Sequence, residues 1–150
     1  MKKICKRILL FLFCFVILRF VINRNSYSIR IVGNSMDPAL RSGQLVTYEY
    51  RNTLNYGDIV LLKPFPTKTI VKRVVVFPGD SIGFQDGNLI RNGQVITELY
   101  AITDQTTCDT ILIPEGMIYV LGDNRSVSID SRKIGCISID SYLGTVLIPD

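Results

Sequence analysis

The chain of 150 residues contains no histidine. This absence excludes a Ser-His-Asp triad, a Cys-His catalytic pair and any metal site built on histidine ligands. Cysteine is also scarce, since Cys5 and Cys14 lie in an apolar N-terminal segment and only Cys108 and Cys136 remain in the rest of the chain. No CxxC spacing occurs, so we expect neither a metal nor a cofactor. Cys108 and Cys136 could form one disulfide in an oxidising compartment or remain two buried thiols.

Positive charge is confined to the start of the chain. Residues 1–24 hold six of the 17 basic residues and no acidic residue, and the remaining chain has 11 basic and 13 acidic residues. A body with this balance lacks the basic surface of a nucleic-acid-binding protein. We therefore expect no nucleic-acid partner.

The N-terminal segment has the pattern of a membrane anchor. Ile8–Leu18 is an unbroken run of 11 apolar residues, and Ile4–Ile22 is 19 residues long, close to the ~20 that cross a bilayer as a helix. Basic residues before the run favour a cytoplasmic N-terminus. Residues 1–24 are thus predicted to form a cytoplasmic tip and a single-pass anchor in the cell membrane, with the lipid bilayer as a partner and the body extracytoplasmic. A signal peptide cleaved near Ser26–Ser28 is the alternative.

The body has the pattern of a β protein. Short runs of β-branched and aromatic residues alternate with Gly, Pro, Asn and Asp, as in strands joined by turns. Asn92-Gly93, between two apolar runs, predicts a hairpin, and Asp86-Gly87 predicts a turn. The fold class expected is mostly antiparallel β behind one transmembrane helix, with the polar stretch 98–109 unassigned. The expected strands are Tyr27–Val32, Gln44–Tyr50, Asp58–Lys63, Thr69–Phe77, Asn88–Ile96, Ile111–Ile113 and Met117–Leu121.

Ser35 and Lys72 are candidates for a catalytic pair. Ser35 follows an apolar run and Gly33, and without histidine a serine nucleophile needs another base, for which lysine is the usual replacement. Strand periodicity places Lys72 on one face with Ile70 and Val74. Burial there would lower the lysine pKa from about 10.4 toward the roughly 7–8 that a general base requires. The alternatives are a serine that only stabilises a turn and an edge-strand lysine that discourages aggregation.

A third segment, Leu121–Arg132, is a polar loop after an apolar strand. It contains three serines, two aspartates and two arginines. A serine hydroxyl from this loop could hold the lysine amine in place, and Asp130 could pair with Arg132 and fix the loop. A solvated surface loop is the alternative.

Six short segments that contain Ser35, Lys72 and parts of the polar loop follow one another in an order that resembles the motif boxes of type I signal peptidases of the short, Gram-positive kind. The resemblance extends over about residues 29–149. It implies an antiparallel β catalytic domain of the signal peptidase type at 27–150, with a small β cap inserted at about 82–113. The matching segments are Gly33–Pro38, Gly57–Val60, Lys72–Val74, Pro78–Asp80, Gly122–Arg125 and Ser128–Arg132.

The resemblance also implies a role for each matched residue. Ser35 corresponds to the nucleophile, Lys72 to the general base and Ser128 to the serine that orients the lysine amine. The supporting ion pairs would be Asp130–Arg132 and Arg73–Asp123. The oxyanion would be bound by the Ser35 N–H. Some family members add a serine hydroxyl at the position that Gly33 occupies here, so this chain lacks that donor.

The implied activity is that of a membrane-bound endopeptidase, which removes signal peptides from exported preproteins after small residues in an Ala-x-Ala pattern. Beside Gly33, the side chains expected to narrow the substrate pockets are Ile31, Met36, Leu40 and Ile70. A self-cleaving Ser-Lys repressor is disfavoured, because the chain has an apolar leader and no DNA-binding domain. A non-catalytic chaperone or assembly factor for exported surface subunits is the alternative from another class.

Overall fold

The computed structural model describes Phe13 and residues 26–148. The predicted anchor, residues 1–24, therefore lies outside the described residues apart from Phe13. Within the described part of the chain, no helix has both the length and the apolar character needed to cross a membrane.

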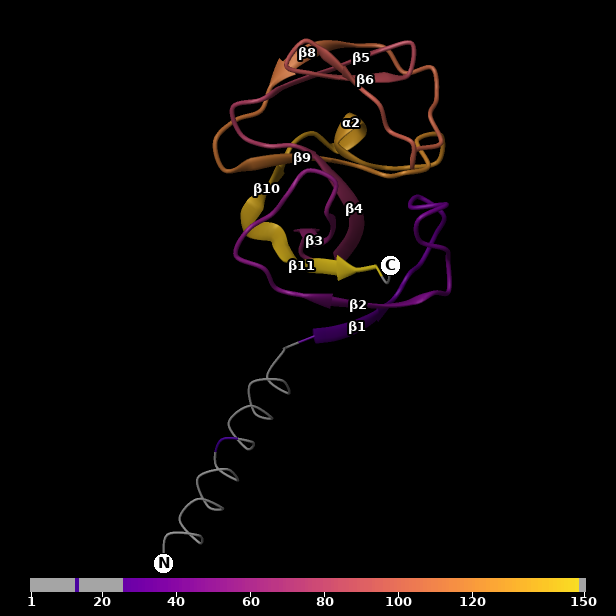
Figure 1. The fold of residues 1–150 in the computed structure, drawn as a ribbon, viewed down its shortest axis with the longest axis vertical. Helices are drawn as coiled ribbons and strands as arrows, with labels where there is room; N and C mark the ends of the chain where they lie inside the picture. Colours follow the sequence, from indigo (N-terminus) through magenta and orange to yellow (C-terminus); the bar gives the residue numbers. More distant parts are fainter. Residues whose placement is uncertain (1–12, 14–25, 149–150) are drawn as a thin grey trace, which may run out of the picture.

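The described residues fold into two antiparallel sheets with connecting loops and a short helix (Figure 1). The larger one has the strand order β1-β2-β11-β3-β4-β9-β10, so the last long strand of the chain lies in its interior, between β2 and β3. Its strands are β1 (Ser26–Arg30), β2 (Leu45–Glu49), β3 (Ile59–Phe65), β4 (Lys68–Val76), β9 (Met117–Leu121), β10 (Ile137–Ser138) and β11 (Tyr142–Leu147). A short helix, α2 (Ser131–Ile134), and a 3-10 turn, η1 (Ile139–Ser141), lie between β9 and β11.

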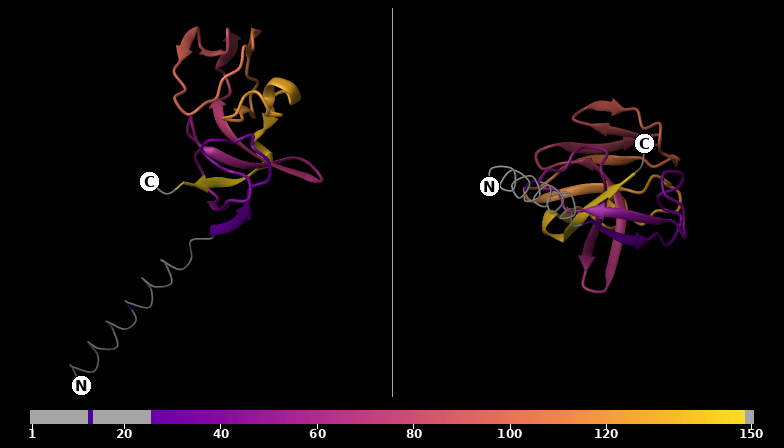
Figure 2. Two further views of the ribbon diagram at one scale, coloured as in Figure 1. Left: turned by 90° about the vertical axis from the view of Figure 1, so that its right-hand side faces the viewer. Right: turned by 60° about the horizontal axis from the view of Figure 1, so that its bottom comes forward.

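The smaller sheet is inserted between β4 and β9 and has the order β7-β6-β5-β8. Its strands are β5 (Ser81–Gln85), β6 (Asn88–Arg91), β7 (Gln94–Ile96) and β8 (Cys108–Leu112). The turns Asp86-Gly87 and Asn92-Gly93 join the first three, and all four turn residues have positive φ, as two-residue hairpin turns of type I′ require. The smaller sheet lies at the end of the molecule remote from β1 and β2 (Figures 1 and 2).

Three buried clusters hold the fold together. One joins the two sheets, with Val76 of β4 and Leu121 of β9 packed against Phe84 and Leu89 of the smaller sheet. A second fills the larger sheet around β3, β4 and β9. The third packs Met36 and Leu40, from the loop after β1, against Ile59 and Val146. This third cluster fixes the loop that carries Ser35.

The expectation of mostly antiparallel β structure is confirmed for the described residues, but the strand assignment was incomplete. β5 was missed as a strand. β11 was missed as well, because Gly144 interrupts its apolar pattern. A β-carbon at Gly144 would lie 2.6 Å from Tyr48 Cδ2 and 2.9 Å from the Glu49 carbonyl oxygen, so glycine permits the close approach of β2. The predicted strand Asn88–Ile96 is two strands, β6 and β7, joined by the expected turn.

Candidate active site

Ser35 lies in a loop that buried side chains attach to the core. Gly33 has a φ of 87°, which glycine adopts readily, and it turns the chain away from β1. Met36 and Leu40 are each 1% exposed, and the Leu40 N–H donates to the Met36 carbonyl at 2.9 Å. Packing of the buried side chains and a backbone hydrogen bond therefore hold the loop of Ser35 in place.

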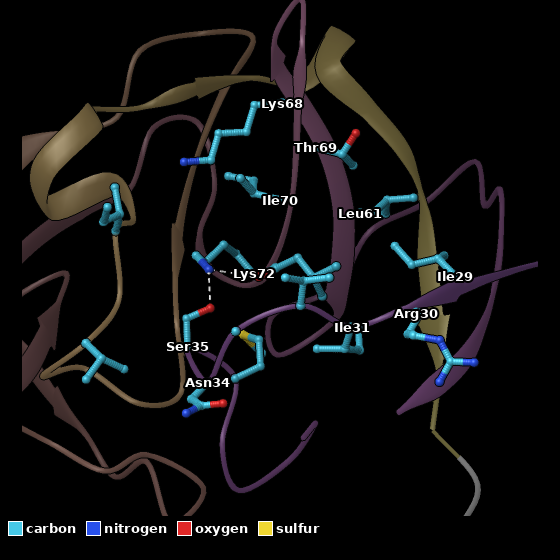
Figure 3. A pocket seen from close by; sticks show the side chains of 16 residues that line it. Ile29, Arg30, Ile31, Asn34, Ser35, Leu61, Lys68, Thr69, Ile70 and Lys72 are labelled. Carbon is cyan, nitrogen blue, oxygen red and sulfur yellow. Dashed lines mark hydrogen bonds between the residues drawn. The ribbon is translucent and has the colours of Figure 1, made fainter. Parts of the chain in front are cut away.

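Lys72 reaches Ser35 from β4. Its Nζ donates to the Ser35 Oγ at 2.7 Å and to the Val71 carbonyl at 3.0 Å (Figure 3). Lys72 is only 4% exposed. Burial lowers the pKa of Lys72 to about 8, although the negative charge of Asp130 acts in the opposite direction. Part of the amine is therefore neutral near physiological pH, and a neutral amine can accept the proton of the Ser35 hydroxyl.

Both side chains lie in a cleft of about 620 Å³. One wall is formed by residues 29–36 and the other by residues 68–72 of β4, with Val127 and Ile129 from the polar loop. Among the described strands, residues 68–72 of β4 pair with β3 alone, because β9 begins to pair with β4 at Arg73. The cleft therefore contains a strand edge to which an extended peptide could add.

Ser128 is completely buried next to Gly122. A β-carbon at Gly122 would overlap the Ser128 hydroxyl and would lie 2.5 Å from the Ser35 carbonyl oxygen. Glycine at this position therefore lets the polar loop pack against the loop of Ser35. The Ser128 hydroxyl makes no hydrogen bond of standard geometry with the described residues, but it lies close enough to Asp130 to help lower the pKa of that carboxyl. The hydrogen bonds of the Lys72 amine go to Ser35 and Val71.

Asp130 organises the polar loop from its interior. Its carboxylate accepts from the Gly122 N–H at 3.0 Å and from Arg132 Nε at 2.9 Å, and it caps the start of α2 through the Arg132 N–H. Burial by itself would raise the pKa of Asp130, but the hydrogen bonds from Arg132 and the Gly122 N–H stabilise the carboxylate and lower the pKa overall. Asp130 is thus a fixed negative charge close enough to Lys72 to oppose the lowering of the Lys72 pKa.

Arg73 and Asp123 form a second buried ion pair. Arg73 Nε and Nη2 donate to the two carboxylate oxygens of Asp123 at 2.8 and 2.6 Å, a bidentate arrangement. The next residue, Asn124, donates its N–H to the Ser35 carbonyl at 3.1 Å. Asp123 thereby connects β4 to the segment that holds the nucleophile loop.

The unassigned stretch 98–109 supplies residues that the sequence reasoning missed. Glu98 pairs with Arg125 at 2.7 Å, and both side chains are almost fully buried. Asp104 pairs with Arg132 at 2.7 Å. The signal was Arg125, which has no acidic partner within the polar loop, because Asp123 pairs with Arg73 and Asp130 pairs with Arg132. Glu98 and Asp104 lie 27 and 28 residues before their arginine partners in the sequence, so these pairs could not be predicted from local patterns.

The predicted pocket residues divide into two groups. Ile31, Met36, Ile70 and Gly33 line the cleft, whereas Leu40 does not and is a core residue. The Gly33 N–H donates to the Ser42 hydroxyl at 3.2 Å. The sequence reasoning did not single out Ser42. By contrast, the Ser35 N–H donates to no described residue, so it is available to a bound oxyanion.

The cysteines and acidic residues show no metal centre in the part of the chain that the structure describes, where no three of them converge. Cys108 and Cys136 are both free thiols. The disulfide alternative is therefore wrong for this structure, and so is the burial expected of both thiols, because Cys108 is exposed.

Comparison with known proteins gives consistent results at the level of family, sequence and fold. The chain is 31% identical to signal peptidase IB of Staphylococcus aureus over 91% of this chain and 81% of that protein. It is 33% identical to signal peptidase I of Bacillus caldolyticus over 77% of this chain and 74% of that protein. The crystal structure of a signal peptidase I from Enterococcus faecalis superposes with a TM-score of 0.51 at 27% identity, covering 63% of this chain and 97% of the other. Residues 1–149 match the family described as signal peptidase, peptidase S26, and the chain belongs to that family.

Proposed function

We propose that this protein is a serine endopeptidase that cleaves signal peptides from exported preproteins after small residues. The observation that carries the proposal is the 2.7 Å contact between Lys72 Nζ and Ser35 Oγ inside a cleft with a free strand edge. A serine hydroxyl with a desolvated amine in hydrogen-bond reach is the arrangement that nucleophilic catalysis needs when histidine is absent.

In the proposed mechanism the neutral amine of Lys72 takes the proton of the Ser35 hydroxyl as Oγ attacks the scissile carbonyl carbon. The Ser35 N–H binds the oxyanion that forms on the carbonyl oxygen. Lys72 then gives its proton to the departing amine, which leaves an ester on Ser35. In the second half Lys72 deprotonates a water molecule that attacks this ester, and the proton returns to Ser35 Oγ as the peptide carboxylate is released.

The surrounding residues have supporting roles in this proposal. Ser128 orients the Lys72 amine, for which its buried hydroxyl, unpaired among the described residues, is suited. The ion pairs of Asp130 with Arg132 and of Arg73 with Asp123 hold the polar loop against the nucleophile.

The substrate is proposed to bind as an added strand along residues 68–72 of β4. Ile31, Met36 and Ile70 narrow the cleft, so that small side chains fit next to the scissile bond and large ones do not.

Residues 1–24 anchor the protein in the membrane with an extracytoplasmic catalytic domain, residues 27–150. The smaller β sheet, within about 82–113, forms the cap of this domain.

A direct test is cleavage of a preprotein with an Ala-x-Ala site by the full-length protein in detergent. The wild type is expected to release the signal peptide, and Ser35→Ala is expected to release none while keeping the circular dichroism spectrum of the wild type. A metal chelator or a thiol reagent should leave the rate unchanged. A wild-type protein that binds the preprotein without cleaving it would instead establish the chaperone or assembly alternative.

The pH dependence of cleavage follows from the Lys72 pKa of about 8. Because only the neutral amine can act as the base, log kcat/KM is expected to rise with a slope of one below about pH 8 and to level off above it. The measurement uses a peptide without groups that titrate between pH 6 and 10. A rate that is constant from pH 6 to pH 9 would contradict a lysine base.

A further inference from the structure

The lining of the cleft has one sign of charge. Among the residues that the structure describes, its charged residues are Arg30, Lys68 and Lys72, and no aspartate or glutamate lines it. A peptide that enters the cleft therefore meets a positive surface from both walls, and a charged side chain of the peptide would be attracted or repelled according to its sign.

Two of these three cations are engaged within the protein. Arg30 Nη1 donates to the Gly43 carbonyl at 2.7 Å, and Lys72 is bonded to Ser35 and Val71. The side chain of Lys68 is exposed, and its ammonium group forms no hydrogen bond or ion pair with the residues that the structure describes. Its ammonium group is thus the one lining cation that no described residue orients, whereas Arg30 keeps its charge but is held by the Gly43 carbonyl.

The position of Lys68 along β4 defines which part of a substrate it meets. Lys68, Ile70 and Lys72 alternate on one face of the strand and all line the cleft (Figure 3). Four residues of strand span about 13 Å at ~3.3 Å per residue. A peptide added to the free edge runs at the same rise, so a peptide residue beside Lys68 lies about four residues from the one beside Lys72.

We propose that Lys68 is a specificity-determining residue that reads the charge of the substrate about four residues upstream of the residue at the scissile carbonyl. It favours preproteins with a carboxylate there and disfavours those with lysine or arginine. This inference rests on the proposed function, and it includes a peptide that runs parallel to β4, so that its acyl side lies along residues 68–72 with the scissile carbonyl next to Lys72.

The test uses three peptides that are identical except for Glu, Gln or Lys at that upstream position. The ratio of kcat/KM for the Glu peptide to kcat/KM for the Lys peptide is measured at low ionic strength for the wild type and for Lys68→Glu. We expect the wild type to prefer the Glu peptide by about fivefold and Lys68→Glu to reverse the preference, as for single exposed charge pairs. Lys63→Glu is the matched control, since Lys63 is an exposed lysine of β3 that does not line the cleft.

The ratio of the two kcat/KM values separates a direct effect of Lys68 on the choice of substrate from an indirect effect through the pKa of Lys72. Lys68 also contributes to the lowered pKa of Lys72, but a change in the base alters cleavage of both peptides equally and cancels in the ratio. An unchanged ratio in Lys68→Glu, or an equal reversal in Lys63→Glu, overturns the assignment of Lys68 alone. Failure of the wild type to cleave even the Gln peptide overturns the proposed function and this inference with it.

Discussion

Replacing Lys72 with methionine is expected to abolish cleavage while making the folded protein more stable at neutral pH. The loss of activity follows because no other base lies within hydrogen-bond reach of the Ser35 hydroxyl among the described residues. Removal of one member of a nucleophile–base pair lowers kcat by about 10⁴-fold or more in hydrolases of this kind. Ser35→Ala should have an effect of the same size, and the double variant should lose little more than either single one.

The gain in stability follows from the burial of the amine. The pKa of Lys72 falls from 10.5 to about 8 on folding, which at ~1.36 kcal/mol per pKa unit corresponds to a cost of about 3 kcal/mol. Because the folded-state pKa is the lower one, the unfolded chain binds more protons between pH 8 and pH 10.5. Stability of the wild type therefore rises with pH through this range, and the cost is complete below pH 8. Methionine has a similar length without the charge and escapes this cost.

Urea unfolding at several pH values measures the difference between wild type and Lys72→Met. The variant should be more stable by up to about 3 kcal/mol at pH 7 and no more stable above pH 10.5. Lys63→Met, at an exposed lysine, should change stability by less than about 0.5 kcal/mol and leave cleavage intact. A Lys72→Met protein that is less stable than the wild type at pH 7 would show that the amine is not desolvated.

Sequence reasoning predicted the parts of the site that strand periodicity and local turns determine. Lys72 was expected on the face of β4 that carries Ile70, and the two side chains share the cleft lining. The Asn92-Gly93 hairpin was expected, and the turn joins β6 to β7. The resemblance to signal peptidases is confirmed by the family match over residues 1–149. These features depend on residues within about ten positions of one another or on a motif with a fixed order.

Features set by distant contacts were not accessible from the sequence. Leu40 was expected in a substrate pocket, but the cluster with Val146 of β11 buries it, and the sequence does not reveal that β11 lies between β2 and β3. Glu98 was unassigned because its partner, Arg125, is 27 residues away. The apolar character of Leu40 and the charge of Glu98 were visible in each case, and only the tertiary fold shows what they contact.

Breaking the buried pair of Arg73 and Asp123 should lower the stability of the protein strongly. Asp123 is 1% exposed at its side chain and Arg73 is 11% exposed. Asp123→Ala leaves the guanidinium buried without its carboxylate, which costs about 3–5 kcal/mol. The change also frees the segment whose Asn124 N–H holds the Ser35 carbonyl, so kcat should fall together with stability.

Asp123→Ala should therefore lower the urea midpoint strongly, whereas Glu49→Ala should lower it little. Glu49 pairs with Arg51 through a single contact of 3.0 Å between side chains that are 20% and 40% exposed, and such pairs contribute about 0.2–1 kcal/mol. The double variant Arg73→Met/Asp123→Leu removes both charges and should recover most of the loss, because an apolar pair avoids the desolvation of two ions. It should not recover all of it, since the Gly57 carbonyl loses the Arg73 hydrogen bond of 2.7 Å, worth about 1 kcal/mol. If the double variant were no more stable than Asp123→Ala, the uncompensated charge of Arg73 could not be the cause of the loss.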